Sequence, residues 1–206
     1  MRPVATILFH LAVVGTLLIA PIAVALGQER SDRAEAGIEW SRLANGRTDF
    51  EVSDPALLPT RLALAAERSG CRYKEAIGNS SPARFTKIGS YRLAILACWS
   101  ISGWHQVFDL STLERPRPVE FPVAVRPEGF GTTLRPGWIN WEKETSIFQA
   151  VRGSDMVPSW KTRHTHRFDG HSGFVVVRVE IQRVPWPDEW TSIWQTPRWP
   201  LPEGKQ

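Results

Sequence analysis

Hydrophobic and polar positions follow three different patterns along the chain. Residues 4–26 are almost purely apolar, whereas residues 28–46 are polar and charged. From residue 71 onward, short apolar or alternating runs are separated by Gly, Ser, Asn and Pro. Runs of this kind, bounded by turn residues, predict a succession of short strands.

One amphipathic helix is predicted between residues 53 and 70. Ser53 or Asp54 can cap its N-terminus, and Gly70 suits its end. Pro59 can delay the first helical turn. The apolar residues of this segment recur at helical spacing and should pack on a sheet: Leu57, Leu58, Leu62 and Ala65.

The remaining pattern predicts an α+β fold, with a mainly antiparallel β-sheet and one or two packed helices in a single domain over residues 51–199. Residues 91–100 are nearly all apolar and should form a central strand. In residues 173–184, polar positions alternate with valines in the second half, which indicates one exposed face. Residues 129–133, GFGTT, are interpreted as a loop. The predicted strands are 71–77, 83–89, 91–100, 105–111, 119–125, 145–152, 161–169 and 173–184.

The apolar start of the chain predicts export. A positive start, an apolar run and the small residues at 23–27 are typical of a signal peptide over residues 1–27. The run is also long enough for an uncleaved membrane anchor, which is the alternative. We expect a flexible or short helical lead-in over residues 28–50, a disordered tail over residues 200–206, and a periplasmic or secreted protein, soluble after cleavage.

Charge and cysteine content narrow the function classes. The net charge of +4 is scattered along the chain, which argues against a nucleic-acid partner. The two cysteines, Cys71 and Cys98, are predicted to form a disulfide because the chain is expected to be exported. A redox role is not favoured, because the chain has no C-x-x-C motif.

Residues 162–174 hold three of the five histidines. On a strand, His164 and His166 point to the same face, and such a pair can bind zinc when a third ligand completes the set. His171, Asp169 or His105 could be that ligand, and zinc would then activate a water for hydrolysis.

A plain β-hairpin explains the same segment better. Asp169 and Gly170 suit a turn, and Gly173 precedes the next strand. Arg163 and Arg167 flank the histidines and would repel a cation. The face that carries the histidines is expected to be half-exposed. We therefore favour the hairpin over a metal site with His164, His166 and His171.

The ten tryptophans suit either a core or a ligand platform. Trp186, Trp190 and Trp194 are four residues apart, which places them on one face of a helix. Core packing of this element against the sheet is favoured, and a platform that stacks on sugar rings is the alternative. No nucleophile motif or phosphate-binding loop occurs, so we nominate no catalytic residue and no cofactor.

Several short motifs resemble a known family. They are Cys98, Gly103-Trp104, Phe121-Pro122, Arg152-Gly153, Phe168-Asp169-Gly170 with Phe174, and Trp186-Pro187 with Trp190 or Trp194. Over roughly residues 90–196 the chain resembles the secreted bacterial family catalogued as domain of unknown function 1176. That family has further cysteines near its R-G motif and after its hairpin, which this chain lacks. The resemblance implies an exported protein of unknown activity and assigns no site residue.

These observations favour an exported, non-enzymatic domain that binds another envelope protein or a cell-wall component. Enzymatic activity is left open. The alternatives are a zinc-dependent hydrolase centred on His164 and His166 and a membrane-anchored envelope protein. The sequence does not set the oligomeric state.

Overall fold

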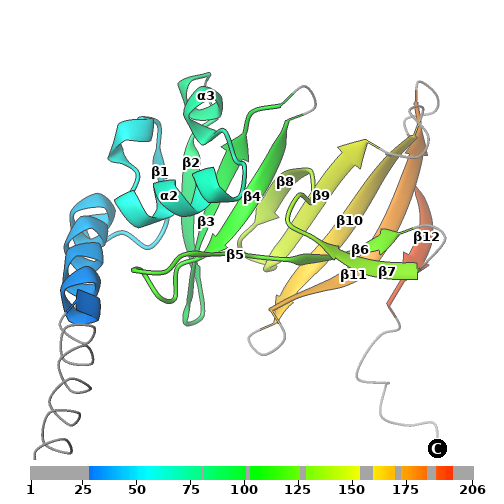
Figure 1. Ribbon diagram of the computed structural model, residues 1–206. Coiled ribbons are helices and arrows are strands. Elements are labelled where there is room, and N and C mark those ends of the chain that lie inside the picture. The colour runs from blue at the N-terminus through cyan, green and yellow to red at the C-terminus, as the bar shows by residue number, and fades with distance from the viewer. Residues whose placement is uncertain are drawn as a thin grey trace, which may run out of the picture.

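The computed structural model describes most of the chain after the predicted signal peptide (Figure 1). The predictions for residues 1–27, His171, Trp186 and the tail over residues 200–206 concern residues outside the described ranges. No helix among the described residues is long and apolar enough to cross a membrane. The described ranges are 28–79, 81–100, 103–125, 129–153, 160–169, 173–184 and 189–196.

The first third of the described chain is mainly helical. Residues 28–44 form a helix, so the predicted lead-in is helical over most of its length. Two short helical elements then follow, the 3-10 helix η1 (Pro55–Leu57) and the α-helix α2 (Thr60–Arg68). Asp54 caps η1, since its Oδ1 accepts a hydrogen bond from the Ala56 N–H. Pro59 does delay the main helix, and Leu57 falls in η1 and is exposed.

One predicted strand is a helix. Residues 71–77 were expected to be extended, but α3 (Tyr73–Gly78) occupies this segment. Its buried residues Tyr73 and Ile77 lie four positions apart, which is helical spacing. Because the segment is short, alternation over a few residues did not distinguish the two periods.

Two five-stranded antiparallel sheets form the body of the molecule (Figure 1). The first sheet has the order β1-β2-β3-β4-β5, and the second has the order β12-β11-β10-β9-β8. The strands of the first sheet are β1 (Phe50–Val52), β2 (Ala83–Ile88), β3 (Tyr91–Cys98), β4 (Trp104–Asp109) and β5 (Arg117–Pro118). Those of the second are β8 (Trp138–Glu142), β9 (Ile147–Gly153), β10 (Trp160–Asp169), β11 (Gly173–Arg183) and β12 (Thr191–Gln195).

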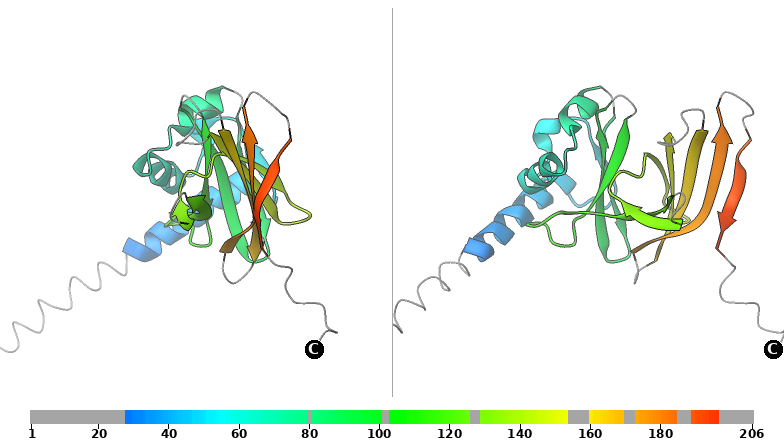
Figure 2. Two further views of the ribbon diagram at one scale, coloured as in Figure 1. Left: turned by 90° about the vertical axis from the view of Figure 1, so that its right-hand side faces the viewer. Right: turned by 45° about the vertical axis from the view of Figure 1, so that its right-hand side comes forward.

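A separate hairpin of β6 (Phe121–Val125) and β7 (Gly129–Thr133) lies against the second sheet, and the right-hand view of Figure 2 shows it crossing those strands. Figure 1 and the right-hand view of Figure 2 place the helix over residues 28–44 and strand β12 at opposite ends of the molecule. The α+β prediction with mainly antiparallel strands is confirmed. Residues 129–133, expected to be a loop, are instead strand β7.

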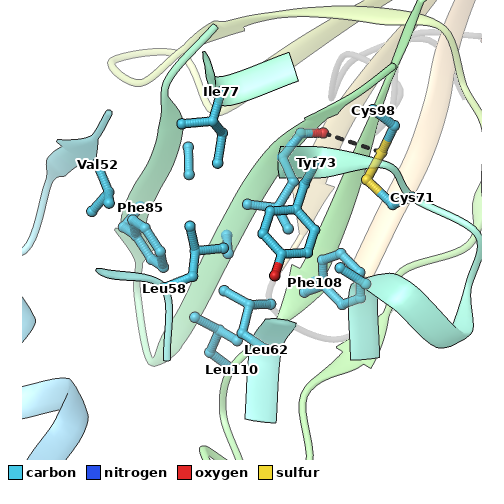
Figure 3. Close-up of a cluster of buried hydrophobic side chains, with 14 of the residues drawn as sticks. Val52, Leu58, Leu62, Cys71, Tyr73, Ile77, Phe85, Cys98, Phe108 and Leu110 are labelled. Atoms are coloured by element: carbon cyan, nitrogen blue, oxygen red, sulfur yellow. Dashed lines mark hydrogen bonds between the residues drawn. A yellow bond between two sulfur atoms is a disulfide. The ribbon is translucent and has the colours of Figure 1, made fainter. Parts of the chain in front are cut away.

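The first core lies between the helices and one face of the first sheet (Figure 3). Leu58, Leu62 and Ala66 supply the helical side, while Phe85 and Phe108 supply the sheet side. The disulfide between Cys71 and Cys98 lies within this cluster and joins the start of α3 to the end of β3, with its Cα atoms 4.9 Å apart. The predicted cysteine pairing is confirmed.

The opposite face of β3 belongs to a second core. Leu93 and Ile95 pack there with residues of β6 and of the second sheet, including Phe121 and Phe148. Strand β3 is therefore buried on both faces, as its apolar run predicts. The predicted alternation in β11 is only partly right, because Glu180 is 7% exposed and pairs with Arg163 at 2.8 Å.

Removal of the disulfide should destabilise the fold by about 3–4 kcal/mol, because the bridge restricts the unfolded chain over a separation of 27 residues. The double variant Cys71→Ala/Cys98→Ala can be compared with the wild-type protein by urea unfolding at pH 7. Wild-type protein kept in reductant should reach the same lowered midpoint. An unchanged midpoint in both samples would contradict the role assigned to the bridge.

Candidate ligand pocket and the histidines that shape it

His105 joins the two sheets. Its backbone N–H donates to the Gly137 carbonyl at 2.8 Å, and its Nδ1 accepts from the Ile139 N–H at 2.7 Å. Gly137 and Ile139 are two residues apart, so these groups lie on one edge of β8, opposite the edge that pairs with β9. One residue of β4 thus supplies both partners for the free edge of β8.

The hydrogen bond to Ile139 requires a neutral His105. An imidazolium has no lone pair, so it could not accept from a backbone N–H. Burial lowers the pKa of His105 from 6.5 to about 4, and the nearby charge of Arg84 acts in the same direction. Since Nδ1 is an acceptor, Nε2 carries the ring proton.

His164 and His166 likewise form hydrogen bonds with backbone groups on the free edge of β6. The Nε2 of His164 accepts from the Ala124 N–H at 3.0 Å. The Nε2 of His166 lies 2.8 Å from the Pro122 carbonyl oxygen and therefore donates to it. Proline has no N–H, so one acceptor and one donor match the groups that this edge presents.

Burial also keeps this pair neutral. His164 is 1% exposed and His166 is fully buried. The pKa of His164 is lowered to about 4, chiefly by burial, with smaller contributions from the neighbouring His166 and Arg152. Burial lowers the pKa of His166 as well, although its bond to Pro122 acts in the opposite direction. The shared face of the two histidines is confirmed, but the expectation that this face is half-exposed is wrong, because β6 covers it.

The hairpin interpretation agrees with the strand pairing. β10 and β11 pair antiparallel up to Asp169 opposite Gly173. The rings of His164 and His166 are 6.0 Å apart between centroids. Within the described ranges, no three His, Cys, Asp or Glu side chains come together as a metal site. His171 lies outside those ranges, so the zinc hypothesis remains untested.

The described part of the tryptophan segment is not helical, contrary to the spacing argument made from the sequence. Residues 191–195 form strand β12, so Trp190 and Trp194 do not share a helical face. The guanidinium of Arg163 lies 4.4 Å from the centre of the Trp190 ring, and Phe130 meets Trp194 edge-on at 5.0 Å. Both indoles are therefore already in contact with other side chains.

A pocket of about 290 Å³ lies where the two sheets meet. Its apolar floor includes Ile95 of β3 and Ile139 of β8, both buried. The pocket is shaped by His105, because the bonds of this residue to β8 hold the two sheets together at that point. The described lining residues are Ser81, Pro82, Arg84, Ile95, His105, Trp138, Ile139, Asn140 and Trp141.

Trp138 is the most prominent wall of this pocket. It is 46% exposed, yet its indole packs edge-on against His105 with ring centres 4.7 Å apart. Gly103 lies under the indole, and a Cβ at that position would overlap the ring. Gly103 also has a φ of +60°, which favours glycine. An exposed aromatic face is thus held in place by the backbone beneath it.

Polar groups surround the aromatic wall. Asn140 supplies an amide, and Arg84 supplies a guanidinium whose Nε donates to Glu51 at 3.0 Å. A concave site with apolar walls and a few placed polar groups is typical of small-ligand pockets. This arrangement can stack on a ring and hydrogen-bond the substituents at its rim.

A larger cavity beside the helix over residues 28–44 is less suited to a ligand. Its volume is about 370 Å³, and four of its charged lining residues are already paired with each other. Arg61 meets Asp32 at 2.9 Å, and Arg115 meets Glu29 at 3.1 Å. These contacts attach the helix to the domain, so we assign the cavity no ligand.

The sequence analysis did not identify the pocket. Trp138, Asn140 and Trp141 lie close together in the sequence, but Arg84 and His105 come from the other sheet. The sequence feature that could have indicated the pocket is the segment 138–141, WINW. Its two tryptophans flank an isoleucine, which is buried, and an asparagine.

No family model matches the chain, and neither does any curated protein or solved structure with which it was compared. The resemblance to family 1176 therefore remains a prediction.

Stability should fall as the pH is lowered from about 6.5 to about 4. In this window His105 and His164 are protonated in the unfolded chain but remain neutral in the folded protein, because burial lowers their pKa to about 4. Lowering the pH therefore favours the unfolded state. At about 1.4 kcal/mol per pKa unit, His164 alone accounts for about 3 kcal/mol, fully present above pH 6.5 and lost by pH 4.

Urea unfolding at several pH values tests this linkage in the wild-type protein and in His164→Gln. The glutamine keeps an oxygen near Nε2 that can accept from Ala124, but it does not titrate. The variant should have a shallower pH dependence over the same window. Equal slopes in the two proteins would show that His164 does not titrate as described.

Proposed function

We propose that this chain is an exported, non-enzymatic binding domain, and that the pocket beside Trp138 takes a ring-shaped polar ligand of the cell-wall saccharide class. The exposed indole of Trp138, held against His105 and over Gly103, is the observation that carries this proposal. The face of a pyranose ring presents C–H groups that pack on an indole. Its hydroxyls can pair with Asn140 and with the remaining donor of His105.

The chemistry of the pocket supports binding rather than catalysis. His105 uses the lone pair of Nδ1 to hold Ile139, so this atom is not free to act as a base. The lowered pKa of His105 keeps the ring neutral near pH 7, so it does not act as a general acid there either. Among the described lining residues there is no carboxylate to pair with it as acid or base. The zinc alternative has weaker support, because the Nε2 atoms of His164 and His166 are both bonded to β6.

Export is supported by the disulfide and by the apolar start of the sequence. Disulfides persist in oxidising compartments and are rare in the cytosol. Such a compartment would place the pocket beside cell-wall saccharides. A retained N-terminal anchor would leave the domain on the same side of the membrane.

Trp138→Ala should weaken binding of the disaccharide of N-acetylglucosamine and N-acetylmuramic acid at least tenfold, because it removes the stacking surface. Isothermal titration can measure this effect. Trp99→Ala is the matched control, since Trp99 is 48% exposed and does not line the pocket. Equal losses in both variants, or no binding by the wild-type protein, would count against the proposal.

The intact mass of untagged protein from the cell envelope should lack about the first 25–27 residues and two hydrogens. Mass spectrometry with and without reductant measures both changes. A mass that retains Met1, in a membrane fraction, would replace cleavage with the anchor. A native mass that is raised by one zinc ion in the wild-type protein, with no bound zinc in His164→Ala, would favour the hydrolase instead.

A further inference from the structure

We propose that the pocket selects a ligand that carries a carboxylate, and that Arg84 is the residue that recognises it. This inference rests on the proposed function, because it concerns the same pocket. It goes beyond that function by naming the charge of the ligand and a competing group within the protein. The proposal depends on the charge balance of the lining residues and on the geometry of one cross-strand ion pair.

Arg84 is the sole charged side chain among the described residues that line the pocket. The others are apolar, aromatic or neutral polar groups, and burial and the charge of Arg84 keep His105 neutral. The lining therefore has a charge of +1. A single guanidinium beside aromatic walls suits a ring that carries one carboxylate, because the planar fork of arginine matches the two carboxylate oxygens.

The present partner of Arg84 shows what the ligand would replace. Glu51 of β1 stands directly across from Arg84 of β2, and its carboxylate accepts from Nε at 3.0 Å. Both side chains are about half exposed, so this ion pair contributes little to stability and can exchange. Glu51 does not line the pocket, whereas Arg84 does.

Glu51 is therefore an internal competitor for the ligand carboxylate. With Glu51 in place, the guanidinium is partly neutralised and held on β1. When an acidic ligand enters, its carboxylate takes over the guanidinium and Glu51 moves into water. Removing either partner should then change the affinity in opposite directions, which a merely structural ion pair would not do.

The test compares N-acetylmuramic acid with its methyl ester, which differ at the carboxylate alone. In isothermal titration the wild-type protein should bind the acid about tenfold more tightly than the ester. Arg84→Gln should bring this ratio close to one. Glu51→Gln should raise the affinity for the acid about two- to fivefold, because it removes the competitor.

Arg72→Gln provides the control, since it breaks a similarly exposed pair, with Glu75 at 2.9 Å, away from the pocket. It should leave the preference for the acid unchanged. Equal binding of acid and ester by the wild-type protein would overturn the inference and leave the proposed function standing. Binding of neither compound would overturn both.

Discussion

A strand edge buried inside a protein needs a partner for every N–H and C=O group, and here three imidazoles supply partners that backbone strands do not. His105 accepts from β8, His164 accepts from β6, and His166 donates to β6. Each bond requires a defined tautomer, and the two acceptors also require a neutral ring. The side-chain contact between the two sheets and the position of the β6–β7 hairpin both depend on these tautomers and on the neutral acceptor rings.

The surroundings maintain the neutral rings. Burial makes the charged form costly, so the pKa of His105 and of His164 falls to about 4. The arrangement has its own cost. The Nδ1 of His164 carries the ring proton and has no partner in the described part of the chain, which is unfavourable by about 1–3 kcal/mol. The ring of His105, which connects the two sheets, also packs against Trp138, and both side chains line the pocket.

Local pattern predicted much of the fold and little of the pocket. The apolar run at residues 91–98 indicated a strand buried on both faces, and β3 is such a strand. Residues 71–77 and the segment around Trp190 were too short for alternation to decide between helix and strand. Two glycines in residues 129–133 led to the prediction of a loop. The segment forms strand β7 because its backbone pairs with that of β6. Spacing placed His164 and His166 on one face, but their burial depends on the β6–β7 hairpin, which is a tertiary feature. The contact between the two sheets that brings Arg84 and Trp138 into one pocket is also tertiary.

The tautomer and charge of the three histidines test this account most directly. Long-range ¹H–¹⁵N NMR of the imidazole rings, recorded between pH 7.5 and pH 5, reports both. The account predicts a proton on Nε2 of His105 and His166 and on Nδ1 of His164 at pH 7, with His105 and His164 still neutral at pH 5.5. Titration of His105 or His164 near pH 6.5, or a proton on Nε2 of His164, would contradict it.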